Sequence, residues 1–489
     1  MNDRTDKWIT CGVVPLVFLL LYALTAQRGV SWQDSGEFHY RVLATDCLWN
    51  PGIARAHPLY ILGASLMAAC APVPLKFYAI TFFSGVGMAT ALAFLAMILW
   101  RLTANRWATL AATFTLGLSH MCWWLSAMAE VYTWSLAFLM IELFCLLIIC
   151  LRKPKVALPW WLALAFLNGM NASIHNFAFL NLPVYGALFI ASRKGIRAAA
   201  ACAIAWLAGA GLLVCLFCAE IRAQTFAVAF KSLLFGYDYE NVVLGKGPIN
   251  WKLAIANLAL ASVSFASPCW FFMTRNVRTL RDYVAFKRCL LALTCIHFVF
   301  WLRYFVPDQA TFILPTLGLC AVWLGIGYAT ARRSRTAHAA LLAIGITCQL
   351  ALPPVLCVIA SRCGVMQARS LPFRQDIPYW LLPWKHNETS AQQFVDTVED
   401  MLHDHDVLIP DSTSAGPLMA TEALRKTPSV WRLVLPWSGG TSEELLALTR
   451  QPDTRVFVVS PVAGYTPAVL LDTKRFEPEG ILYRVLEKP

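Results

Sequence analysis

Two carboxylates three residues apart stand just after the first apolar segment, in the stretch VSWQDSGEFHY. These are Asp34 and Glu37, and the same loop continues to ARAHPLY, which carries Arg55 and His57. A carboxylate can take a proton from a hydroxyl group, and nearby cations can stabilise an anionic leaving group. Outer carboxylates with cations nearby would therefore suit base-assisted transfer of a group from an anionic leaving group, with one of the carboxylates as the base. An ordinary solvated loop in which Asp34 or Ser35 caps an interfacial helix is the alternative.

Further polar residues stand at the ends of later apolar segments. Glu130 in SAMAEVYTW begins one segment, and a carboxylate well inside a membrane costs about 3 kcal/mol, so such residues are usually functional. At the edge the cost is smaller, and a structural Glu130 that holds a neighbouring Arg or His is the alternative. His175 in NASIHNF ends another segment, and Arg303 and Asp308 flank the proline of RYFVPDQATF. Arginine suits phosphate because its planar fork donates two hydrogen bonds. Hydrogen bonding between helices and snorkelling of Arg303 to lipid headgroups are the structural alternatives.

The composition places these residues in a membrane protein. The chain has 489 residues, of which 58% are hydrophobic and 14% charged, and its mean hydropathy is +0.58. Soluble globular proteins are less apolar, and a membrane-spanning helix needs about 20 apolar residues. The sequence predicts about 11 spans in a mainly α, polytopic fold. They are expected at 9–26, 75–100, 107–125, 131–151, 158–175, 177–192, 198–218, 251–273, 289–306, 310–330 and 337–360.

The distribution of charge predicts the orientation. The net charge is +12, which by itself would also suit nucleic acid. The basic residues, however, cluster in alternate short loops, which is typical of the cytoplasmic side of a membrane protein, while most of the acids fall in the other loops. We therefore expect a multi-pass protein of a bacterial inner membrane with a cytoplasmic N-terminus, no nucleic-acid partner and a periplasmic C-terminal part.

The chain divides into three predicted parts. Residues 1–360 form the transmembrane domain, whose first outer loop, 27–74, has the mixed character of helices lying at the membrane surface. Residues 361–384 are rich in proline and aromatic residues and predict an interfacial linker. Residues 385–489 predict a small extracytoplasmic α/β domain, with strands at DVLIP, WRLVLP, RVFVVSP and ILYRVL and a helix over 441–450.

Four motifs resemble, in the same order, those of the protein O-mannosyltransferase-like family, the relatives of transmembrane protein 260. They are WQDSGEF with ARAHPLYILGA, then WWLSAMAEVYTW, GMNASIHN and VPDQATFILP. The family belongs to the GT-C class of polytopic glycosyltransferases, and the resemblance covers about residues 10–320. It implies inverting transfer of a sugar from a polyprenyl-phosphate donor, with an acid of the first outer loop as base. By position that acid is Asp34, with Glu37 beside it. The AHPLY stretch is shorter than the AHPPGYPLY type found in the family.

The resemblance and the layout together give the other residues their expected roles. Arg303, His57, Arg55 and His175 are expected to bind the donor phosphate, with Glu130, Asp308 and Tyr60 supporting the site. The Asp-x-x-Glu spacing leaves open a divalent metal, and no other cofactor is implied. The acceptor, which is a protein, a glycan or a lipid, stays open. A transporter or flippase for a lipid-linked anion and a ligase for lipid-linked glycans are the alternative functions.

Overall fold

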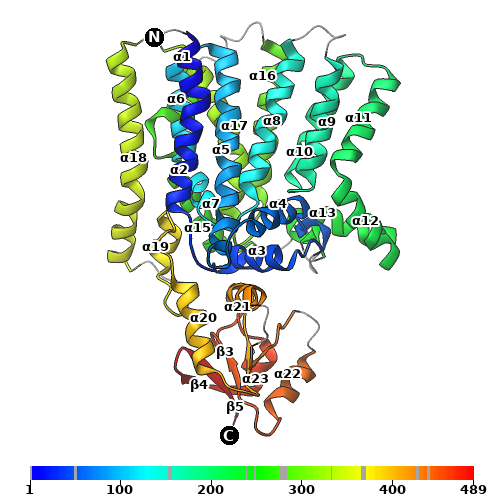
Figure 1. Ribbon diagram of the computed structural model, residues 1–489, viewed down its shortest axis with the longest axis vertical. Coiled ribbons are helices and arrows are strands. Elements are labelled where there is room, and N and C mark those ends of the chain that lie inside the picture. Colours follow the sequence, from blue (N-terminus) through cyan, green and yellow to red (C-terminus); the bar gives the residue numbers. More distant parts are fainter. Residues whose placement is uncertain are drawn as a thin grey trace.

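The structure is a computed structural model in which long helices stand side by side and a small α/β domain lies at one end of them (Figure 1). It describes residues 3–48, 52–151, 157–237, 239–246, 249–275, 283–331, 333–364, 370–425, 429–437 and 441–488.

Six helices of the described residues are long and apolar enough to cross a membrane. An apolar helix is suited to this because it satisfies its backbone hydrogen bonds internally. The six are α1, η1 and α2 together (Arg4–Thr25), η3 with α5 (Val73–Thr103), α8 (Tyr132–Leu151), α16 (Val284–Arg303), η9 with α17 (Gln309–Ala329) and α18 (Arg335–Arg362). The chain is thus a multi-pass membrane protein that is mainly α-helical, as predicted.

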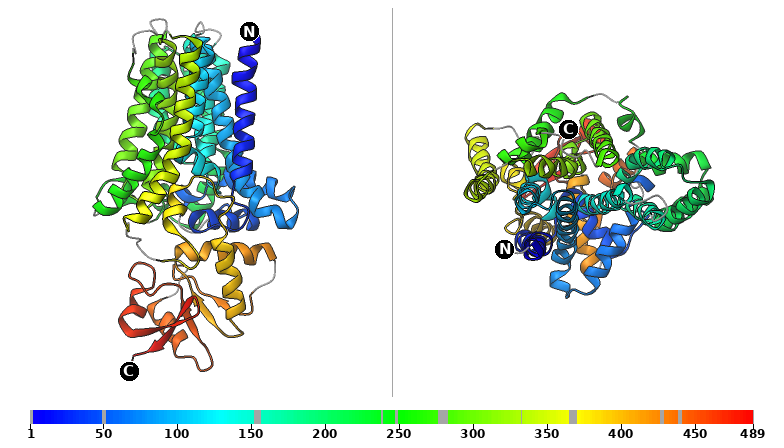
Figure 2. Two further views of the ribbon diagram at one scale, coloured as in Figure 1. Left: turned by 90° about the vertical axis from the view of Figure 1, so that its left-hand side faces the viewer. Right: turned by 90° about the horizontal axis from the view of Figure 1, so that it is seen from above.

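Other apolar segments are shorter or bent. Two pairs would each make one further span, namely α11 (Ile196–Gly209) with α12 (Gly211–Ala223), bent by 78°, and α15 with η5 (Trp251–Phe265) followed by η6 (Pro268–Thr274), bent by 94°. The predicted span 107–125 is divided into α6 (Arg106–Gly117) and α7 (His120–Ser126). The predicted spans 158–175 and 177–192 correspond to the shorter helices α9 (Leu158–Ala172) and α10 (Phe177–Ala191). The count of 11 spans stays a prediction. Helix α18 stands at one edge of the bundle and α11 and α12 at the other (Figures 1 and 2).

One carboxylate lies within a membrane helix and is fully enclosed. Glu142 of α8 accepts hydrogen bonds from Nδ2 of Asn171 at 2.9 Å, Asn168 at 3.2 Å and Asn181 at 2.9 Å, and from the Tyr185 hydroxyl at 2.8 Å. The donors come from α9 and α10. Polar side chains of this kind join helices where no water is present.

The first outer loop folds as α3 (Gln33–Ala44), η2 (Ile53–Arg55) and α4 (Pro58–Ala69). Helices α3 and α4 lie across the end of the bundle, as expected for interfacial helices (Figure 1). The loop between α12 and α15 forms α13 (Phe226–Phe235) and α14 (Glu240–Val243), and α13 packs against η2. This layer of short helices covers the end of the bundle that faces the α/β domain.

The α/β domain contains a five-stranded mixed sheet in the order β2-β1-β3-β5-β4. Strand β1 is parallel to β2 and β3, whereas β5 is antiparallel to β3 and β4. Helix α19 (Asp376–Leu381) precedes the domain and packs on the bundle, where His120 donates to the Leu381 carbonyl and Trp124 to the Tyr379 carbonyl. The elements of the domain are α20 (Ser390–Met401), β1 (Val407–Ile409), α21 (Ser412–Arg425), β2 (Arg432–Leu433), α22 (Ser442–Thr449), β3 (Val456–Val458), α23 (Ala468–Thr473), β4 (Lys474–Glu479) and β5 (Leu482–Glu487). Four strands and the α22 helix fall where the sequence predicts them. The domain boundaries at 360 and 385 stay a prediction.

Candidate functional site

Helix α3 carries both acids of the first outer loop at the junction between the bundle and the α/β domain. Asp34 lies in the first turn of α3 with an exposed side chain, whereas Ser35 and Gly36 beside it are buried. Glu37 follows one residue later and is partly buried. A helix places residues three apart on neighbouring positions of its surface, so Asp34 and Glu37 lie close together.

Three further carboxyl groups lie within electrostatic range of Asp34. Burial and then the charge of Asp34 raise the pKa of Glu37 to about 7, although Arg55 and Arg41 oppose this rise. The same two causes hold the pKa of Glu130 well above its usual range and raise the pKa of Asp308 to about 6. The structure thus brings four predicted acids together, from α3, from the start of α8 and from the start of η9.

Hydroxyl groups fix the two acids that come from the bundle. The Ser35 hydroxyl donates to Glu130 Oε1 at 2.9 Å, and the Tyr132 hydroxyl donates to Asp308 Oδ2 at 3.2 Å. Ser84 Oγ accepts the Glu130 backbone N–H at 2.8 Å and donates to the Glu130 carbonyl at 2.9 Å. Because the single Ser84 proton is used in this way, Tyr60 donates its own at the 3.2 Å contact with Ser84. Tyr60 therefore supports the site through Ser84.

Two arginines face Glu37, and one of them is available to a ligand. Arg41 Nη1 lies 3.6 Å from Glu37 Oε1, and Arg55 Nη2 lies 3.8 Å from Glu37 Oε2. The Arg41 side chain is fully buried and donates to the carbonyls of Arg55, at 3.0 Å, and of Ala56. Arg55 is 32% exposed and lies over the ring of Tyr239, 5.6 Å from its centroid. Arg41 thus holds the backbone from which Arg55 projects.

His57 and His175 stack on each other with opposite hydrogen-bonding roles. Their ring centroids are 5.4 Å apart and their planes differ by 15°. Burial lowers the pKa of both below its usual range, that of His175 to about 3, so both rings are neutral. His57 Nδ1 donates to the Ile174 carbonyl at 2.7 Å, whereas His175 Nδ1 accepts the Phe177 N–H at 3.2 Å. The remaining nitrogen of His175 is therefore a donor, and that of His57 an acceptor.

The backbone of His57 is left-handed, as it also is at seven other described non-glycine residues, among them Ala104 and Arg193. Its φ angle is +49°, a left-handed conformation that residues other than glycine seldom adopt. Such conformations cost of order 1–3 kcal/mol and are concentrated at functional sites.

Arg303 makes no ion pair with the acids among the described residues. It ends α16 with an exposed side chain, and its guanidinium lies against Gly245, which has a φ of +70°. Among the described residues Arg303 forms no ion pair, and it is not among the charges that shift the pKa of Glu37, Glu130 or Asp308. Its expected contact with the donor phosphate stays a prediction.

The Asp34–Glu37 pair fits a divalent ion poorly. Both oxygens of Glu37 face arginines, whose positive charges oppose a dication. Among the described residues no group of three or more His, Cys, Asp or Glu side chains is arranged to hold a metal ion.

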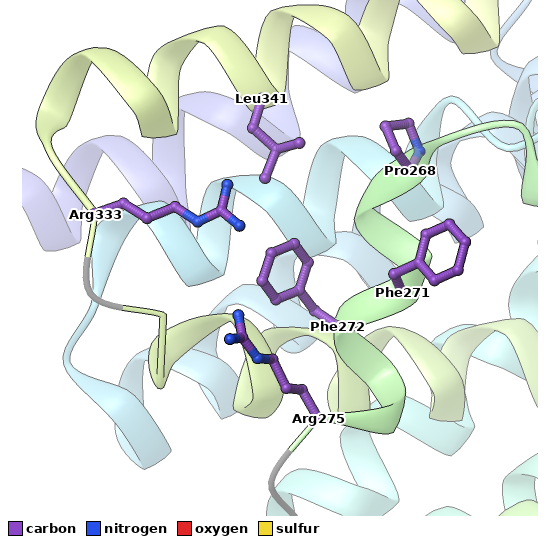
Figure 3. A pocket seen from close by; sticks show the side chains of 6 residues that line it. All are labelled: Pro268, Phe271, Phe272, Arg275, Arg333 and Leu341. Carbon is purple, nitrogen blue, oxygen red and sulfur yellow. The ribbon is translucent and has the colours of Figure 1, made fainter.

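A cavity of about 360 Å³ lies away from these acids (Figure 3). It is bounded by η6, by the start of α18 and by the residues after α17, with Arg275 and Arg333 at its wall. Asp308 precedes η9 and α17, whereas Arg333 of the cavity wall follows α17, so the length of α17 (Leu314–Ala329) separates the cavity from Asp308. It therefore does not serve the acid cluster.

Four residues of the site, namely Ser35, Ser84, Tyr132 and Arg41, were not predicted from the sequence, and no motif pointed to Ser84. Ser35 stands between the two predicted acids, and Tyr132 follows Glu130 in AEVYTW, so both lie within motifs already singled out. Arg41 lies four residues after Glu37, which is the spacing of an ion pair on a helix. This spacing could have identified Arg41 in the sequence.

No protein-family model and no curated protein matches the chain. Solved structures do match it. ArnT from Cupriavidus metallidurans bound to undecaprenyl phosphate is similar with a TM-score of 0.62 at 12% identity, over 98% of this chain and 97% of that chain. An oligosaccharyltransferase of Archaeoglobus fulgidus, tethered with an acceptor peptide, is similar with a TM-score of 0.50 at 11% identity, over 93% of this chain and 69% of that chain.

At this level of identity the likeness concerns the fold. The fold is that of the polytopic GT-C glycosyltransferases, which confirms the predicted fold class. The protein O-mannosyltransferase-like family itself stays a prediction. The likeness to ArnT extends over nearly the whole of both chains, so it includes the C-terminal α/β part.

Proposed function

We propose that this protein is a glycosyltransferase that moves a sugar from a polyprenyl-phosphate donor to an acceptor hydroxyl, with inversion at the anomeric carbon. The reaction takes place at the end of the bundle covered by α3, which we take to be the outer face of a bacterial inner membrane.

One observation carries the proposal: Asp34 is exposed at the meeting point of three carboxyl groups whose pKa is raised partly by its charge. Glu130 is buried, which raises its pKa well above its usual range, and its Oε1 already accepts a hydrogen bond from Ser35, so it is not open to an acceptor hydroxyl. Asp34 is thus the accessible carboxylate of the cluster, as general-base catalysis requires.

The chemistry follows from this arrangement. The acceptor hydroxyl gives its proton to Asp34, and its oxygen forms a bond to the sugar C1. The bond between C1 and the phosphate oxygen breaks, and its electron pair leaves with the polyprenyl phosphate. Arg55 is the cation placed to stabilise the departing phosphate, and the Nε2–H of His175 can donate a hydrogen bond to it. The neighbour ArnT was solved with undecaprenyl phosphate, which supports a donor of this class.

The transporter alternative is less well supported. A path for a lipid-linked anion needs polar groups through the membrane that are free to meet the cargo. Glu142 is the carboxylate buried within α8, and its oxygens already accept four hydrogen bonds from side chains of α9 and α10. The carboxylate of Glu142 therefore stabilises the packing of α8 on α9 and α10 and is not free to bind a transported anion.

The test is sugar transfer by the purified protein in nanodiscs, offered a panel of polyprenyl-phosphate sugars. Asp34→Asn should lower kcat by about 10²–10⁴-fold, the usual contribution of a general base. Asp404→Asn, an exposed aspartate in a turn of the α/β domain, is the matched control and should keep full turnover. Undiminished turnover of Asp34→Asn would refute the role of Asp34. No transfer by the wild type from any donor would refute the proposed function.

A further inference from the structure

Helices α3 and α21 touch backbone to backbone at two glycines. A Cβ atom built on Gly416 would lie 2.8 Å from the Gln33 carbonyl oxygen and 2.8 Å from the Glu37 nitrogen. A Cβ atom on Gly36 would lie 3.0 Å from the Gly416 carbonyl carbon. Carbon atoms pack at about 3.5–4.0 Å, so neither helix can carry a side chain here at the present separation.

This contact is part of a larger junction around the start of α3. The Trp32 indole donates to Ser390 Oγ of α20 at 2.7 Å, and its ring packs on Phe394 with centroids 5.0 Å apart. The Lys385 backbone N–H donates to the Thr25 carbonyl at the end of α2 at 2.8 Å. Figure 1 shows α21 lying directly beneath α3, between it and the sheet. The α/β domain therefore contacts the bundle through the end of α2 and the residues that begin α3.

The opposite side of the same helical turn is fixed to the bundle. Ser35, which precedes Gly36, donates to Glu130 at 2.9 Å. The first turn of α3 is thus held between α21 on one side and Glu130 on the other. Asp34 belongs to this turn, and the Glu37 N–H lies at the glycine contact itself. A displacement of α21 would consequently move both acids relative to the bundle.

We propose that the α/β domain positions the catalytic helix, and that Gly416 is a positioning residue for Asp34. The inference rests on the proposed function, because a positioning role for Gly416 requires that Asp34 takes part in turnover. It gives the α/β domain a role in catalysis in addition to any contact with the acceptor. A catalytic group must be held within a fraction of an ångström, and a misplacement of about 1 Å can cost 10²-fold in rate.

The experiment compares Gly416→Ala and Gly416→Val with the wild type, in the full chain in nanodiscs. Gly186→Ala is the matched control, since a Cβ atom there meets nothing within 4 Å. We expect kcat to fall by about tenfold to 10²-fold for alanine and further for valine, while KM for the donor changes by less than about twofold. A role confined to acceptor capture would instead raise KM for the acceptor and leave kcat unchanged.

Hydrogen exchange of the same proteins gives a readout that does not depend on turnover. We expect the amides of residues 33–44 to lose protection in the Gly416 variants, while those of β1 and β3 keep theirs. If valine unfolds the α/β domain, the alanine variant decides. Unchanged kcat in an active protein, or unchanged protection of α3, would overturn the inference. Absence of transfer by the wild type would instead refute the proposed function. The hydrogen exchange of residues 33–44 would still show whether Gly416 holds α3 in place.

Discussion

The raised pKa of Glu37 makes a prediction about stability. Its side chain is 19% exposed, and burial and the Asp34 charge raise its pKa from the ordinary 4.5 to about 7. The folded chain therefore binds this proton more tightly than the unfolded chain does. The stabilisation that results is complete below pH 4.5 and is lost as the pH rises through about 7. The difference between the two values corresponds to about 3 kcal/mol.

The substitution Glu37→Gln should remove this pH dependence. The amide does not titrate, so the difference in unfolding free energy between wild type and variant should change by about 3 kcal/mol between pH 4.5 and 8, in favour of the variant at high pH. The pKa values of Asp308 and Glu130 are also raised, so both groups add to the pH dependence of the unfolding free energy. The main charge acting on them is that of Asp34, which Glu37→Gln retains. Their contributions are therefore similar in the wild type and the variant and largely cancel in the difference.

The assay is unfolding by denaturing detergent in mixed micelles at several pH values, with the apparent free energy of unfolding taken at each. Asp404→Asn, which removes an exposed carboxylate, should run parallel to the wild type. If the curves of Glu37→Gln and the wild type are also parallel, burial does not hold a proton on Glu37 and the electrostatic account of the cluster is wrong.

Two further predictions concern the donor phosphate. Arg55→Gln should weaken binding of polyprenyl phosphate by at least about tenfold, because a charge-assisted hydrogen bond contributes about 1.5–3 kcal/mol. Arg303→Gln should have a smaller effect. Titration calorimetry in nanodiscs would measure both affinities, and equal losses would contradict the smaller role given to Arg303. His175→Ala should raise KM for the donor more than His57→Ala does, because His175 presents the free N–H; steady-state kinetics with the opposite order would refute the hydrogen-bonding roles given to the two rings.

Much of the fold could be predicted because hydropathy follows directly from the lipid environment. The α/β strands were predicted from short runs of β-branched and aromatic residues bounded by turn residues. Strand β4 was missed because KRFEPE is charged and contains a proline, which is typical of an edge strand and does not stand out as one in a sequence.

The acid cluster could be predicted in part because carboxylates are conspicuous at the ends of apolar segments. The role of Arg303 at the donor phosphate stays a prediction, because the sequence does not show how α16 packs or which way its last turn faces. The junction between Gly36 and Gly416 could not be predicted. A glycine in a helix has many possible reasons, and only the folded chain shows that the two are in contact.

The buried Glu142 has a consequence for how the protein is made. Ribosomal synthesis delivers α8 to the membrane before α9 and α10, whose Asn168, Asn171, Asn181 and Tyr185 supply the hydrogen bonds. An unpartnered carboxylate at the centre of a helix costs about 3 kcal/mol on insertion. Insertion of α8 is therefore more favourable when α9 and α10 are already present to bind its carboxylate, so we expect the three helices to enter the lipid together.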